Sequence, residues 1–109
     1  MPSRTLAPVS ASAAASGNAL IVVEDLKNWT ARIVTNDPSS NTFNYSVQIV
    51  GSAAEAGNTG FLLKSGSGVG DALINNNDGA GRPVSAYAVF ISWTSLSGGN
   101  VSILMRQEY

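Results

Sequence analysis

The stretch that decides the fold is Phe43-Asn44-Tyr45-Ser46-Val47-Gln48-Ile49. Apolar and polar residues alternate along it, and successive side chains of an extended chain point to opposite sides. The apolar residues therefore share one face, and the polar residues share the other. This pattern predicts a β-strand with one face in a core and one face in solvent, which ends at Gly51.

The same period of two runs through much of the chain on either side of this strand. In residues 28–35, Trp29, Ala31 and Ile33 share a face. In residues 84–94 both faces are apolar, which is typical of a central strand covered on both sides. No stretch keeps a helical period. The further strands that we predict lie at residues 19–23, 28–35, 60–64, 84–94 and 101–109.

Residues that favour turns separate these strands. Ser95–Asn100 predicts a hairpin between the last two strands, and Ser65–Gly68 predicts a flexible turn. Residues 52–60 favour a loop over one helical turn, and residues 69–74 fit a strand or a helical turn equally. Short strands joined in this way predict an all-β fold, either a single antiparallel β-sandwich or a small closed barrel.

The first 17 residues differ in composition from the rest. They are rich in Ala, Ser and Pro and keep no sustained period, so we expect an extended N-terminal arm at 1–17 and a β domain at 18–109. Such an arm offers backbone and small side chains that can lie along a neighbouring subunit. The arm residues expected to make these contacts are Pro2, Arg4, Leu6, Pro8 and Val9.

Composition excludes several classes of function. The 109 residues contain no Cys and no His, which removes disulfides, thiolate ligands, Cys nucleophiles and imidazole catalysis. The net charge is −1, so no excess of basic residues exists to bind nucleic acid. No apolar run is long enough to span a membrane. We therefore expect a protein that is not an enzyme, holds no cofactor or metal, and has neither nucleic acid nor membrane as a partner.

Two ligand sites stay open as alternatives. The Asn-rich segment is rich in residues that offer oxygen ligands, which calcium prefers, but their spacing does not match the helix–loop–helix calcium motif. These residues are Asp71, Asn75, Asn77, Asp78 and Gly79. The same segment suits a lectin-like carbohydrate site at Asn75, Asn77 and Asp78. An aromatic side chain would stack on the sugar there, from Trp29, Tyr45, Trp93 or Tyr109. The two Trp residues lie on apolar strand faces, which favours a place in the core.

Charged residues make up only 12% of the chain, against about 25% in an average soluble domain. A surface built from Ser, Thr, Asn and Gly loses few ionic solvation shells when it packs against protein. In this respect, and in its arm, its length and its lack of Cys, the chain resembles the small β-sandwich head decoration or cement proteins of tailed phages. The resemblance is one of overall design and includes no diagnostic motif.

The resemblance implies a homotrimer or similar oligomer on the capsid shell, with the arm against the shell or an adjacent copy. The sequence thus predicts a structural assembly protein of a virion, made in the host cytoplasm. The alternatives are a small carbohydrate-binding module and, for location, the outside of a cell.

Overall fold

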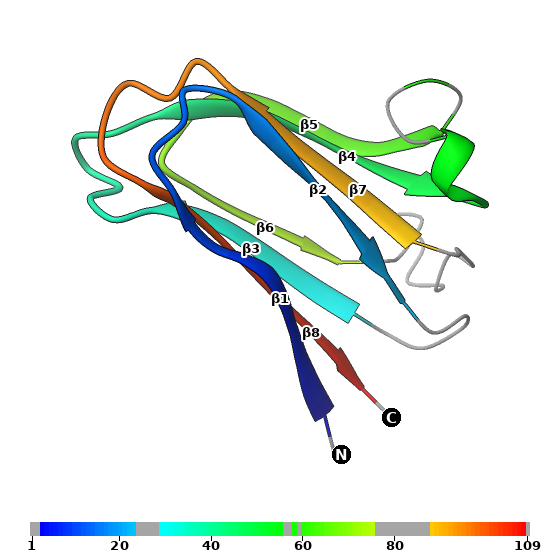
Figure 1. Ribbon diagram of the computed structural model, residues 1–109. Helices are drawn as coiled ribbons and strands as arrows, with labels where there is room; N and C mark the ends of the chain where they lie inside the picture. Colours follow the sequence, from blue (N-terminus) through cyan, green and yellow to red (C-terminus); the bar gives the residue numbers. More distant parts are fainter. Residues whose placement is uncertain (1–2, 24–28, 56–57, 59, 76–87, 109) are drawn as a thin grey trace.

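The computed structural model describes residues 3–23, 29–55, 58, 60–75 and 88–108, which form two packed four-stranded antiparallel sheets (Figure 1). Sheet A has the strand order β1-β8-β3-β6, and sheet B has the order β2-β7-β4-β5. The prediction of an all-β antiparallel sandwich is confirmed. The strands are β1 (Ser3–Ser12), β2 (Gly17–Val22), β3 (Trp29–Thr35), β4 (Phe43–Val50), β5 (Phe61–Val69), β6 (Asp71–Asn75), β7 (Ala88–Thr94) and β8 (Val101–Glu108).

The chain alternates between the sheets. Of the described strands, only β4 and β5 follow one another in the sequence and also pair, whereas every other connection passes from one sheet to the other. This strand order is that of a jelly roll, in which two Greek keys form a double sheet. The predicted hairpin between residues 84–94 and 101–109 is therefore wrong, because β7 lies in sheet B and β8 in sheet A.

Contacts between loops explain why the turn after β7 is not a hairpin. Its Leu96 amide donates to the Ala15 carbonyl, and its Ser97 amide donates to the Thr42 carbonyl, both at 3.0 Å. The amide of Asn100 donates to Oδ1 of Asn36 at 2.9 Å. Three connections thus meet at one end of the sandwich, on the left of Figure 1. The segment between β7 and β8 therefore crosses the end of the core, and its backbone amides find hydrogen-bond acceptors in the other two connections.

The N-terminal segment belongs to the domain. Residues 3–12 form β1, an edge strand that pairs with β8 from Ser3 opposite Glu108 to Ser12 opposite Val101. The predicted boundary between an arm at 1–17 and a domain at 18–109 thus differs from the structure, in which sheet A already begins at Ser3. Two register irregularities interrupt the pairing, one on each side of Val9. Such bulges break the alternation by which a strand is recognised in a sequence.

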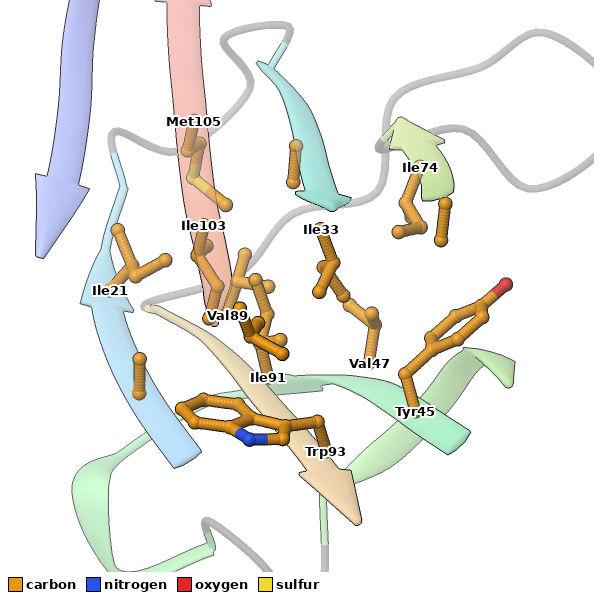
Figure 2. Packing of buried hydrophobic residues seen from close by; sticks show 14 of the residues in the cluster. Ile21, Ile33, Tyr45, Val47, Ile74, Val89, Ile91, Trp93, Ile103 and Met105 are labelled. Carbon is orange, nitrogen blue, oxygen red and sulfur yellow. The ribbon is translucent and has the colours of Figure 1, made fainter. Parts of the chain in front are cut away.

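The core lies between the two sheets (Figure 2). Inward side chains of β3, β4, β7 and β8 fill it, and Ile33, Val47, Ile91 and Ile103 are each at most 1% exposed. Trp29 and Trp93 are buried as their strand faces predicted, at 2% and 3% exposure. Position 17 requires glycine, because a Cβ on Gly17 would overlap the ring of Trp93.

Strand β5 is longer than its sequence suggested. It continues through Ser65–Gly68, where we expected a flexible turn, because these residues pair with β4. A Cβ on Gly66 would come within 2.6 Å of the Tyr45 ring, so the small residue allows the close approach. Most of the ambiguous segment at 69–74 forms strand β6. The described part of the preferred loop at 52–60 includes a 3-10 turn, η1 (Ala53–Glu55). Pairing partners decide these cases, rather than local preference.

Candidate functional surfaces

The outer face of sheet A carries the larger of two described hollows. We call it hollow A; its volume is about 300 Å³, and Thr30, Arg32, Leu73, Leu104 and Arg106 line it. Strand register explains the grouping. Arg32 lies opposite Leu104 on β8 and opposite Leu73 on β6, and Thr30 lies opposite Arg106. Two apolar side chains therefore flank one guanidinium group, and a second guanidinium group lies one row further along.

An ion pair fixes one of these cations. Arg32 Nε donates to Asp71 Oδ1 at 3.0 Å, and Arg32 Nη2 donates to Asp71 Oδ2 at 2.7 Å. The hydrogen bond from Arg32 lowers the pKa of Asp71 below its ordinary value, and the same bond raises the pKa of Arg32. Both side chains remain about half exposed, so the pair orients Arg32 more than it stabilises the fold. Among the described residues, Arg106 has no ion pair.

The outer face of sheet B carries a smaller and uncharged hollow. We call it hollow B; its volume is about 140 Å³, and Asn44, Tyr45, Ser46, Ser92 and Thr94 line it. The hydroxyls of Ser46 and Ser92 share a hydrogen bond of 2.7 Å. Oδ1 of Asn44 accepts a bond of 3.0 Å from the Gly68 amide. Tyr45 is largely buried, and this burial raises the pKa of its phenol. Hydroxyl and amide groups thus dominate a hollow without charge.

Large apolar side chains are exposed at several positions outside the core. Phe61 is 73% exposed and Leu62 is 61% exposed; they are successive residues at the start of β5, so their side chains point to opposite faces of the strand. Leu73 is 63% exposed and Leu104 is 39% exposed, and both line hollow A. Val22, 54% exposed, ends β2. These positions cannot be recognised from the sequence, because three successive apolar residues, Phe61-Leu62-Leu63, show no alternation that would identify the exposed ones.

The structure separates the residues predicted for the arm. Val9 packs against the core of its own chain, whereas the prediction placed it against a neighbouring subunit. In the backbone register, Arg4 lies opposite Gln107 and Leu6 lies opposite Met105. Pro8 falls in the irregular stretch between Leu6 and Val9. Pro2 lies outside the described residues.

The predicted carbohydrate loop is described only at its first residue. Asn75 is the exposed last residue of β6, whereas Asn77, Asp78 and the calcium candidate Gly79 lie outside the described residues. Of the aromatic residues considered for sugar stacking, Trp29, Tyr45 and Trp93 are buried. Tyr109 also lies outside the described residues. The described part of the chain holds no group of three acidic, His or Cys side chains that could bind a metal ion.

No helix in the described ranges has the length and apolar character needed to cross a membrane.

No protein-family profile matches the chain, and no curated protein matches it in sequence. Solved structures do match it in fold. A putative alpha-L-fucosidase from Bacteroides thetaiotaomicron has a TM-score of 0.57 and 9% identity; the match covers 94% of this chain but only 22% of the fucosidase chain. The CBM32 of AlyQ, in complex with 4,5-unsaturated mannuronic acid, has a TM-score of 0.57 and 10% identity, with 97% and 94% of the two chains covered.

A third solved structure is the SPBc2 prophage-derived protein YomS. Its TM-score is 0.54 and its identity 17%, and the match covers 97% of this chain and 90% of YomS. At such identities the likenesses establish the fold alone, and this fold is a β-sandwich.

Proposed function

We propose that this chain is a non-enzymatic structural subunit that packs against further protein copies in a virus or phage particle. The observation that carries the proposal is the exposure of Phe61, Leu62 and Leu73, each more than 60% exposed, on a chain with only 12% charged residues. Leu73 and Leu104 lie together in hollow A, and an exposed apolar patch of this kind marks a surface that binds protein. A partner covers them at little cost in ion desolvation.

The finer form of the proposal is a decoration or cement subunit, located in the virion, with a trimer or similar oligomer as its working state. A match in fold to a prophage-derived protein supports this kind of source. Because β1 belongs to sheet A, the contacts in this form come from the outer faces and edges of the sandwich, and no longer from a free arm.

Sedimentation velocity of the intact chain over a wide concentration range tests the proposal. Raising the salt from about 0.1 M to about 1 M shortens the Debye length from about 10 Å to about 3 Å, which weakens ionic contacts but not apolar ones. We expect an oligomer that persists in high salt. A monomer at every concentration and at both salt levels would count against a structural subunit.

A second function, carbohydrate binding, is favoured by hollow B. Its serine hydroxyls and its amide are the kind of polar groups that fix the orientation of a small ligand. A glycan array with the unaltered chain tests this function, and the double variant Ser46→Ala/Ser92→Ala is the comparison. Binding that the double variant loses would place a sugar site on sheet B. Binding that it keeps would direct attention to the loop after Asn75.

A further inference from the structure

Three of the six Lys and Arg residues of this chain gather at hollow A. Arg32 and Arg106 line it. Lys64 of β5 does not line it, but its Nζ donates to the carbonyl oxygen of Leu73, a lining residue, at 3.3 Å. Because only 12% of the residues are charged, this is a concentration of positive charge at one place on the surface.

Two acidic residues belong to the same strands, and they leave the charge positive. Asp71 on β6 is paired with Arg32. Glu108 follows Arg106 by two positions in the sequence of β8. Three positive and two negative residues leave one net positive charge. Neither Lys64 nor Arg106 forms an ion pair with a described residue.

Strand register directs the two guanidinium groups to the same hollow. Arg106 lies opposite Thr30, and Arg32 follows Thr30 by two positions on β3, which lies between β8 and β6 (Figure 1). Diagonal neighbours of this kind are about 7–8 Å apart, which long side chains can span. A guanidinium group has five N–H donors, and Asp71 accepts two of those of Arg32. Donors of both arginines therefore remain for an anion between them.

The rest of hollow A is mainly apolar. Leu73 and Leu104 lie opposite Arg32, one on each side of it. The volume of about 300 Å³ is at the lower end for small-molecule sites, and a dry cavity of about 150 Å³ can bind benzene. A guanidinium group matches the two oxygens of a carboxylate with parallel hydrogen bonds. A ligand that fits both parts therefore carries a carboxylate and an apolar group about the size of a phenyl ring.

We propose that hollow A binds small organic acids in which a carboxylate is joined to an apolar group. Arg106 binds the carboxylate, Arg32 adds a donor held in place by Asp71, and the two leucines cover the apolar group. The inference goes beyond the proposed structural function and does not rest on it. Since that function uses the same leucines, a bound acid and a protein partner compete for hollow A.

Titration of the full chain with phenylacetate, followed in amide NMR spectra, tests the proposal. We expect the largest shifts at the residues that line hollow A, and none at hollow B. Acetate lacks the ring, and 2-phenylethanol lacks the carboxylate. Each of these probes meets only one part of the site, so each should bind about tenfold more weakly than phenylacetate or worse.

Two variants separate the parts of the site. Arg106→Gln should weaken phenylacetate binding about tenfold but leave 2-phenylethanol binding unchanged, because it removes a charged donor and no apolar wall. Leu73→Ser/Leu104→Ser should weaken the binding of both ring compounds and leave acetate binding unchanged. The matched control is Val22→Ser, an exposed apolar residue of sheet B, which should bind all three probes as the unaltered chain does.

All of these side chains lie outside the core, so circular dichroism should show an unchanged fold in each variant. Shifts centred away from hollow A, or variants that bind phenylacetate as the unaltered chain does, would overturn the site. Equal binding of phenylacetate and 2-phenylethanol would overturn the role of the arginines. None of these outcomes bears on the state of association in sedimentation, so failure of this site is distinguishable from failure of the structural function.

Discussion

The indole Nε1 of Trp93 donates a hydrogen bond to the carbonyl oxygen of Ala14 at 3.2 Å. Trp93 lies at the end of β7 in sheet B, and Ala14 lies in the connection that brings the chain from β1 to β2. The bond therefore ties the N-terminal connection to the indole ring beneath it. The adjacent bond from the Leu96 amide to the Ala15 carbonyl strengthens the same junction.

We expect Trp93→Ala to lower the free energy of unfolding by about 3–5 kcal/mol, because it removes a large buried side chain. Trp93→Phe should lower the free energy of unfolding by less than Trp93→Ala does, because it keeps an aromatic ring in the core. It still loses the hydrogen bond to Ala14, which is worth about 1 kcal/mol. Urea unfolding measures both values. A loss below about 1 kcal/mol for Trp93→Ala would contradict the burial of this residue.

Gly17 should not tolerate a side chain. Gly17→Ala would bring a Cβ into the ring of Trp93, and we expect the overpacking to cost about 1–3 kcal/mol of stability. Gly68→Asn is the control, because open space surrounds this position and Asn tolerates its positive φ of 64°. Thermal melting compares the two variants. Equal melting temperatures would contradict the packing described around Trp93.

Removing β1 should damage the fold. Deletion of residues 2–12 leaves the free edge of β8 without a partner and uncovers apolar residues of the core. We expect the truncated chain to aggregate or to unfold at much lower urea concentrations. Within the intact chain, Val9→Ala should destabilise more than Thr5→Ala, because Val9 packs against the core and Thr5 is exposed. A truncated chain as stable as the intact one would contradict the role of β1 in the fold and support the prediction of a separate N-terminal arm.

The ion pair of hollow A should be visible in an acid titration. Arg32 holds the pKa of Asp71 below its ordinary value of 3.8. The stabilisation is therefore complete above the ordinary pKa and is lost as the pH falls through the lowered pKa of the folded state. Carbon NMR of the Asp71 carboxyl should show a midpoint below 3.8, and Arg32→Gln should raise it. An unchanged midpoint in the variant would exclude the pair in solution.

The sequence pattern was enough to identify the fold class, because alternation along a single strand determines which of its side chains face the core. Alternation indicated the buried side chains Phe43, Tyr45 and Val47, whereas Ile49 is only partly buried and Val50 is buried in its place. The faces of Trp29 and Trp93 followed from alternation in the same way. Alternation does not determine which sheet receives a strand. The hairpin predicted around Ser95–Asn100 failed because long-range bonds from Leu96 and Ser97 draw this segment across the end of the core.

The candidate surfaces were less accessible from the sequence. Hollow A brings together residues of β3, β6 and β8, and this grouping depends on register between strands that are distant in the chain. Val9 illustrates the opposite case: its segment has the composition of a tail, but pairing places it on β1 beside Ile103 of β8. The exposure of Phe61 likewise depends on what surrounds the start of β5.

The most direct test of the structural function is a protein inventory of virus or phage particles purified from the native source, by quantitative mass spectrometry with electron microscopy. We predict that this chain is present in intact particles at a copy number in fixed proportion to the shell protein. Its absence from such particles, together with glycan binding by the isolated monomer, would contradict the proposed structural function.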